Sequence, residues 1–524
     1  MSGVYPAVPP RGALIRKKIT QVGRLATMGL LVASCIYPAG WSASVQAQNL
    51  PNLGDTARED LSPLMERRLG EQIMSSVRRD PDYMDDGPIS EYLNQLGNRM
   101  LDARPDARGE QSYDFEFFAV RDPVLNAFAF PGGFIGFHSG LILAAQSESE
   151  LASVMGHEIG HVAQRHIARM IAGQKYDAFI PLAALALAIL AARSSPDAAM
   201  AVAAGGQGLA IQKQLNFSRE AEREADRIGF QILRDAGFDT NGMVAFFGRL
   251  QASMRNYTDN APAYLRSHPL TSERIADIQA RVLDQRYRQV EDSIDFFLLK
   301  ARIRVLQDST VQGLMDSKTA FELQMKSERP EDRIAATYGL AFVALKQSDT
   351  QKAQALYNQA RKLVEQSKAA QATLTRSSMF ASLAIDIAVA EKRYTQAIAD
   401  AEKSMQQLPL SRGLVYQYAE ALITAKQETK AEGFLRDQVV LYRQDARLQN
   451  LLAKVYAAQG KQALQHIALA EAYAIQVNWK AAMQQLELAR REKDAQYYEL
   501  SVIDAREREW KEAHKDELTE KNKK

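Results

Sequence analysis

The run His157-Glu158-Ile159-Gly160-His161 constrains this chain more than any other feature of its sequence. Residues four apart share one face of a helix, so the two imidazoles can reach one metal ion while Glu158 lies beside them. We predict a helix from Glu150 to about Ala172. Its separate buried stripe would consist of Leu151, Met155, Ile159 and Val162. A five-residue match also arises by chance, so further ligands must support it.

A second predicted helix supplies the remaining ligand. It opens at Ser218 and ends at Gly237, and Glu222 and Asp226 lie four residues apart on one face. Glu222 with the two histidines would complete a tetrahedral Zn²⁺ site, one ion per chain, with one open position. Glu158 would take a proton from the attacking water. Asp226 would hydrogen-bond a ligand imidazole and fix its tautomer.

Small residues and apolar residues indicate how these two helices pack. Gly156 and Gly160 leave one side of the first helix without side chains, so another backbone can approach it closely. The buried stripe of the second helix is predicted to be Ala221, Ala225, Ile228 and Ile232.

This combination of motifs resembles the gluzincin metalloproteases, a family that includes the HtpX heat-shock protease and the CAAX prenyl protease. The similarity covers about residues 60–300 and extends to Asn126-Ala-Phe, Pro131-Gly-Gly and Ser267-His268-Pro269. It implies that His157, His161 and Glu222 bind zinc and that Glu158 is the catalytic base. It also implies a proton-donor role for Asp226. The position of Asp226 one turn beyond a ligand favours the supporting role instead.

The passage from His268 to Arg274 leaves several interpretations open. His268 or Arg274 could stabilise the oxyanion that forms when water attacks the peptide carbonyl. His268 could instead occupy the open zinc position and hold the enzyme inactive until a loop moves. The plainest interpretation is a helix N-terminus capped by Thr271 or Ser272, with Arg274 on the surface. No role is assigned to the remaining histidines, which are His138, His166, His466 and His514.

Aromatic alternation predicts a small sheet between two helical regions. Helical periodicity runs from about residue 64 to 101, and Tyr113, Phe115 and Phe117 then alternate onto one face. The glycines after Pro131 predict a turn into a strand at residues 134–138. That strand could be an ordinary internal hairpin strand, but the family resemblance favours an edge strand to which an extended substrate adds through main-chain hydrogen bonds.

The first 47 residues have the pattern of an export signal. They contain five basic residues and no acid, an apolar segment from Leu25 to Ile36, and a small-residue site that predicts cleavage after Ala47. The alternative is a lipoprotein site at Cys35. Without this segment the chain has 60 basic and 63 acidic residues, or about −3, which excludes an electrostatic case for nucleic acid. We expect a bacterial periplasmic protein.

From about Glu331 the spacing of small residues is typical of tetratricopeptide repeats, with Ala397 and Ala431 one 34-residue period apart. Stacked helix pairs of this type leave a groove that holds peptides or partner proteins. Two apolar runs at residues 178–192 and 198–209 are predicted to form a buried hairpin; a lid or a peripheral membrane contact is the alternative. The other residues of the repeat register are Ala341, Ala353, Tyr357, Ala360, Ala401, Pro409, Ala419, Leu435, Ala470, Tyr473, Ala482, Leu486 and Ala489.

These predictions combine into a mainly α-helical chain: a zincin-type α+β protease domain with a small sheet, then a tetratricopeptide-like repeat domain. The predicted boundaries are 1–47 for the signal, 48–300 for the protease domain, 301–330 for connecting helices, 331–505 for repeats and 506–524 for a charged tail. The expected function is an exported zinc endopeptidase that cleaves unfolded or misassembled envelope proteins, with repeats that dock substrate or outer-membrane assembly machinery. The alternative is a periplasmic chaperone or assembly scaffold with latent protease activity.

Overall fold

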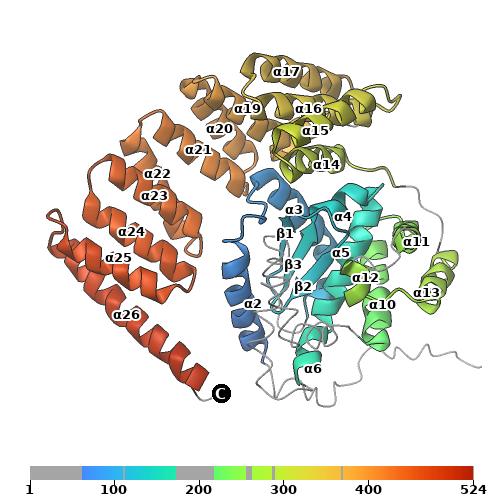
Figure 1. Cartoon of the computed structure of the whole chain (residues 1–524), viewed down its shortest axis with the longest axis horizontal. Coiled ribbons are helices and arrows are strands. Elements are labelled where there is room, and N and C mark those ends of the chain that lie inside the picture. Colours follow the sequence, from blue (N-terminus) through green and yellow to red (C-terminus); the bar gives the residue numbers. More distant parts are fainter. Residues whose placement is uncertain are drawn as a thin grey trace, which may run out of the picture. The chain divides into compact units, whose positions relative to one another are not determined.

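The computed structural model describes residues 62–109, 113–172, 218–254, 263–285, 290–367 and 370–522, as Figure 1 shows. The chain divides into two compact units, residues 1–53 and 54–524, and every described residue belongs to the second. The predicted export signal, Cys35 and the apolar runs at 178–192 and 198–209 lie outside the described residues. Among the helices described, none has the length and apolar character needed to cross a membrane.

The first helical region consists of two helices, α2 (Pro63–Val77) and α3 (Gly87–Ala103), rather than one. Between them the backbone of Tyr83 forms an isolated bridge to Val120 of the sheet. The Asp86 side chain then caps α3 by accepting a hydrogen bond from the Ile89 N–H. A 3₁₀ turn, η1 (Pro105–Arg108), follows α3.

The sheet has three described strands, β1 (Glu116–Val120), β2 (Ala127–Phe130) and β3 (Phe134–His138). Their order is β1-β3-β2, with β3 parallel to β1 and antiparallel to β2. The prediction of an edge strand at residues 134–138 is therefore wrong, because β3 is central and all its residues are buried. Gly132 and Gly133, at φ 81° and 95°, form the turn between β2 and β3. The two strands therefore pair antiparallel, and β2 lies at the edge of the described sheet.

The predicted motif helix is divided into α5 (Glu148–Ala163) and α6 (His166–Ala172). Arg165 between them has φ 51°, the left-handed region, so the prediction of one continuous helix to Ala172 is wrong. The side chain of Ser147 caps α5 by accepting a hydrogen bond from the Glu150 N–H at 3.2 Å. The four predicted stripe residues of α5 are all buried.

Helix α10 (Arg219–Asp235) packs tightly on α5, as the glycines predicted. A Cβ on Gly160 would lie 2.9 Å from the Ala225 carbonyl oxygen, and one on Gly229 would lie 2.8 Å from the His157 nitrogen. The predicted stripe of α10 is partly wrong, because Ala221 and Ile228 are only half-buried. The inward face instead carries the charged pair predicted for the site, together with small and apolar residues: Glu222, Ala225, Asp226, Gly229, Phe230, Ile232 and Leu233.

The described part of the protease region contains four further helices: α4 (Ser139–Ala144), α11 (Asn241–Met254), α12 (Ala263–Ser267) and α13 (Ser272–Leu283). Thr271 caps α13 by accepting a hydrogen bond from the Arg274 N–H, in agreement with the predicted helix start. The short stretch from His268 to Leu270 between α12 and α13 thereby connects two anchored helices.

The C-terminal region is helical throughout its described residues. Left-handed turn residues recur at Lys392, Lys426 and Gly460, one 34-residue period apart, each two residues beyond a helix end. Every alanine and leucine of the predicted register is buried. The helices are α14 (Ile294–Gln307), α15 (Val311–Gln324), α16 (Pro330–Lys346), α17 (Thr350–Gln366), α18 (Thr373–Arg376), α19 (Ser378–Ala390), α20 (Tyr394–Gln407), α21 (Arg412–Thr424), α22 (Glu428–Leu441), α23 (Ala446–Ala458), α24 (Gln462–Ile475), α25 (Trp479–Arg491) and α26 (Tyr497–Asn522).

Three predicted domain boundaries fall inside helices, and the one after residue 330 separates Pro330 from the rest of α16. The boundary at residue 300 lies within α14, and the one at residue 505 lies within α26. Ile503 and Trp510 of α26 are buried against α24 and α25. The first part of the segment predicted as a charged tail is therefore packed on the last repeat helices.

Candidate active site

Helices α5 and α10 bring three potential metal ligands together. His157 Nε2 and His161 Nε2 lie 3.0 Å apart. The Glu222 carboxylate approaches both, with Oε2 3.5 Å from His157 Nε2 and Oε1 3.4 Å from His161 Nε2. All three side chains are at most 1% exposed. Ligand atoms bound at about 2.0–2.1 Å to a tetrahedral Zn²⁺ lie about 3.3–3.4 Å from one another, so these residues fit such an ion.

His268 supplies a fourth donor atom to the same cluster. Its Nδ1 lies 3.0 Å from Glu222 Oε1 and 3.4 Å from His157 Nε2. Donor atoms of these four residues all lie within 4.8 Å of one another. The His268 ring stacks on Tyr264 with centroids 4.6 Å apart, which fixes the ring from α12. His268 is therefore a fourth potential ligand of the cluster.

Glu158 lies beside the donor cluster with an unusually poor set of partners. Its side chain is 1% exposed, yet neither carboxylate oxygen has a hydrogen-bond partner among the described residues. The nearest ion-pairing atom is His268 Nε2, 3.6 Å from Oε1. Burial raises the pKa of Glu158, although His268 and His157 oppose this. A buried carboxylate of raised basicity is suited to accept a proton.

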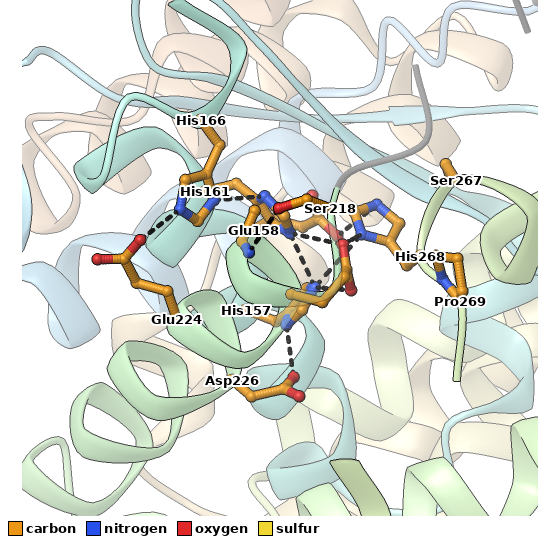
Figure 2. A network of polar contacts seen from close by, with 12 residues as sticks. His157, Glu158, His161, His166, Ser218, Glu224, Asp226, Ser267, His268 and Pro269 are labelled. Carbon is orange, nitrogen blue, oxygen red and sulfur yellow. Dashed lines mark hydrogen bonds and ion pairs between the residues drawn. The ribbon is translucent and has the colours of Figure 1, made fainter. Parts of the chain in front are cut away.

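Asp226 contacts the nitrogen of His157 that faces away from the cluster. The distance from His157 Nδ1 to Asp226 Oδ1 is 2.9 Å, and Figure 2 shows this contact below the cluster. Arg274 Nε and Nη2 donate to the two Asp226 oxygens at 2.6 and 2.8 Å. Arg274 Nη1 lies 2.7 Å from Glu222 Oε2 and donates to the Pro269 carbonyl at 2.8 Å.

The expectation that Arg274 could lie on the surface is wrong, because it is 3% exposed. Its three nitrogens are directed at carboxylates and a carbonyl of the site's own framework. This arrangement matches a group that holds Asp226 and Glu222 in place, because all three nitrogens already contact these carboxylates and the Pro269 carbonyl.

The charges of the cluster are strongly coupled. Burial opposes a charge on His157, but Asp226 and Glu222 outweigh it and raise its pKa to about 10. Burial lowers the pKa of His161 well below its usual range. Burial alone would raise the pKa of Glu222, but the surrounding histidines hold it well below its usual range. Buried imidazoles and an ionised carboxylate at ligand spacing are a donor set that a divalent cation satisfies.

Comparisons with known proteins agree with this geometry. Residues 90–282 match the family described as peptidase family M48, and residues 388–455 match the tetratricopeptide repeat. The beta-barrel assembly-enhancing protease of Escherichia coli K12 is 31% identical over 85% of this chain and 88% of its own length. The chain belongs to peptidase family M48.

Other relatives of this M48 peptidase are more distant or matched over less of their length. A Vibrio cholerae protein of the same designation is 37% identical over 62% of this chain and 66% of its own length. The mitochondrial metalloendopeptidase OMA1 of Arabidopsis thaliana is 27% identical over 48% of this chain and 49% of its own length. These matches establish that the chain is a metallopeptidase with tetratricopeptide repeats.

The M48 site also contains two residues to which the sequence assigned no role. His166, 3% exposed, places its Nδ1 2.9 Å from Nδ1 of the ligand candidate His161. Its Nε2 lies 3.1 Å from Glu224 Oε2. Burial lowers the pKa of His166 to about 4, although Glu224 opposes this. In a straight helix a residue five positions on is rotated by about 140°, so periodicity could not predict this contact.

Proposed function

We propose that this M48 peptidase is a zinc-dependent endopeptidase that cleaves unfolded or misassembled proteins of the bacterial cell envelope. The observation that carries the proposal is the donor set of His157, His161 and Glu222, at the spacing of tetrahedral ligands with Glu158 beside it. His₂Glu with one further position is a ligand set used by catalytic zinc.

Each residue of the site has a distinct task in peptide hydrolysis. Bound zinc supplies a Lewis acid that polarises the scissile carbonyl and acidifies water. Glu158 takes the proton of the attacking water and later delivers a proton to the leaving amine. Asp226 holds the His157 ring, and Arg274 holds Asp226 and Glu222, so both are positioning residues. An extended substrate would pair with the edge strand β2 rather than with β3.

His268 supports a latent form of the enzyme. With its Nδ1 3.0 Å from Glu222 Oε1, this histidine fills the corner that water or substrate needs. Activity then requires that His268 moves away together with the segment between α12 and α13. A chaperone or assembly scaffold with rare proteolysis is the second candidate, and this occupied corner is the observation that favours it.

The repeat region provides a basis for substrate or partner choice. Helix pairs of this type present a concave surface that holds peptides or proteins. The relatives are named for enhancing beta-barrel assembly. We therefore propose that the repeats dock clients or components of outer-membrane assembly in the periplasm. We expect export to the periplasm with cleavage of the signal after Ala47, and lipidation at Cys35 is the alternative. Amino-terminal analysis of the secreted protein distinguishes the two.

The purified protein tests the enzymatic proposal directly. We expect about one zinc per chain and cleavage of an unfolded model protein. Glu158→Gln should keep the zinc and lose cleavage, whereas Glu273→Gln, an exposed glutamate of α13, should retain both. Equal cleavage by Glu158→Gln and the wild type would contradict the proposed mechanism.

The ligand assignment and the client have separate tests. Glu222→Ala should lower the zinc content sharply because it removes one of three protein ligands, and full zinc retention would exclude Glu222 as a ligand. The inactive Glu158→Gln protein should retain clients that the wild type destroys. Envelope proteins that co-purify with it, and not with the wild type, would support envelope quality control; cytosolic proteins alone would contradict it.

A further inference from the structure

His166 contacts the ligand candidate His161 from the side opposite the donor cluster. The two Nδ1 atoms lie 2.9 Å apart and both side chains are at most 1% exposed. Glu224 accepts at the far side of the His166 ring, 3.1 Å from Nε2. Arg169 donates to the same Glu224 oxygen at 2.8 Å. Figure 2 shows His161, His166 and Glu224 joined in this order.

The break between α5 and α6 creates this contact. Residues 161 and 166 would point in different directions on a continuous helix, because five residues correspond to a rotation of about 140°. Arg165 adopts φ 51°, a conformation that residues with a Cβ rarely occupy, and the chain beyond it turns back toward His161.

Neighbouring side chains hold Arg165 in that conformation. Its guanidinium donates to Glu66 of α2, with Nε 2.7 Å from Oε1. The Tyr113 hydroxyl donates to the other Glu66 oxygen at 3.1 Å. Glu66 is itself 4% exposed. A strained residue at a functional site persists only where surrounding contacts specify it, and these contacts do so.

The direction of the hydrogen bonds follows from counting protons. The ionised Glu224 carboxylate can only accept, so His166 must carry its proton on Nε2. A neutral imidazole has one N–H, so His166 Nδ1 is an acceptor and the proton between the rings belongs to His161 Nδ1. The Nε2 atom of His161, which faces the donor cluster, is then the unprotonated nitrogen and directs its lone pair into that cluster.

We propose that His166 and Glu224 form a positioning relay that fixes the tautomer and ring orientation of His161 for metal binding. The relay does for His161 what Asp226 does for His157, with one imidazole inserted between ligand and carboxylate. Arg165 is the left-handed residue whose turn brings His166 to His161. This inference rests on the proposed zinc site.

Zinc affinity, measured by competition with a chelator, tests the relay without reference to activity. His166→Leu should bind zinc about 10–100-fold more weakly than the wild type, the loss typical of outer-shell partners. His166→Asn should restore part of the affinity, because its Oδ1 can accept from His161 Nδ1 in place of the ring nitrogen. His138→Leu is the matched control, since His138 is also 3% exposed but lies at the end of β3 and belongs to no donor cluster among the described residues.

Thermal unfolding of the same variants separates positioning from general packing. Both leucine variants should lower Tm, but only His166→Leu should lose zinc affinity in its folded state. Unchanged affinity in folded His166→Leu, with zinc bound by the wild type, would overturn the relay alone. A wild type that binds no zinc would overturn the proposed zinc site and the relay with it.

A second pair of variants decides the question even if His166→Leu does not fold. Glu224→Gln alters the partly exposed end of the relay and should weaken zinc binding severalfold. Glu220→Gln, one turn earlier on α10 and exposed, should leave it unchanged. Equal zinc affinities for these two variants would overturn the proposal.

Discussion

Arg274 holds Asp226 through a two-pronged ion pair, with Nε 2.6 Å from Oδ2 and Nη2 2.8 Å from Oδ1. Both side chains are at most 3% exposed. The same guanidinium reaches Glu222 at 2.7 Å. One arginine therefore connects a metal-ligand candidate with the carboxylate that orients His157.

Replacing this arginine with lysine keeps the charge but removes the planar guanidinium that makes two hydrogen bonds to Asp226. Arg274→Lys should cost about 1–3 kcal/mol of unfolding free energy, because charge-assisted hydrogen bonds to buried carboxylates are lost. Zinc affinity should fall about 10–100-fold. Urea unfolding and chelator competition measure the two effects.

Arg281→Lys is the matched control on the same helix. Arg281 pairs with Asp277 four residues away, and both side chains are at least 36% exposed. Such a pair contributes about 0–1 kcal/mol, so both measurements should stay near the wild-type values. A loss of turnover in Arg274→Lys at unchanged zinc affinity would instead assign Arg274 to oxyanion stabilisation.

His268→Ala should raise the basal rate of proteolysis several-fold. The substitution removes the His268 nitrogen from the donor cluster, so water and substrate should gain access to it. The initial rate of cleavage of an unfolded protein, normalised to bound zinc, is the measurement. A lower normalised rate would indicate that His268 stabilises the transition state and does not gate the site.

Gly229→Ala should destabilise the protein by about 1–3 kcal/mol through overpacking. The new Cβ would lie 2.8 Å from the Gly156 carbon and from the His157 nitrogen, both of them backbone atoms. Gly248→Ala on α11 is the control, because no atom of the described residues outside its own helical turn lies within 4 Å of its Cβ position. Because Gly248 is helical and exposed, Gly248→Ala should raise the free energy of unfolding by about 0.5–1 kcal/mol. Similar changes for both glycines would contradict close α5–α10 packing.

Asp295→Asn should stabilise the protein in a pH-dependent way. Burial, together with the Glu148 carboxylate and against a hydrogen bond from Ser377, raises the pKa of Asp295 to about 6. The unfolded chain has the ordinary pKa of about 3.9, so folding is penalised by ionisation above pH 6 and not below pH 4. The free energy of unfolding of the asparagine variant should therefore exceed that of the wild type by about 1–2 kcal/mol at pH 8 and by much less near pH 4.

Urea unfolding of both proteins at several pH values checks this prediction. The gain should grow as the pH rises between about 4 and 6 and then level off. A gain that is the same at every pH would show that ionisation of Asp295 is not its source.

Local rules were sufficient for the part of the site that lies within single helices. The four-residue spacing placed His157 with His161 and Glu222 with Asp226, and the structure brings these pairs together. Capping residues also located helix starts, as at Thr271. These features depend on helical periodicity and on side chains within one turn, both of which can be read from a short segment.

Contacts between distant segments could not be read in the same way. The central position of β3 depends on strand pairing, and the burial of Arg274 depends on how α13 packs on α10. The proposed role of His166 depends on one left-handed residue, Arg165. A hydrogen bond to Glu66, 99 positions away in the sequence, helps to hold Arg165 in that conformation. The sequence by itself determined the chemistry of the metal centre, and only the tertiary structure decided which groups support it, because backbone breaks and long-range ion pairs have no local periodicity.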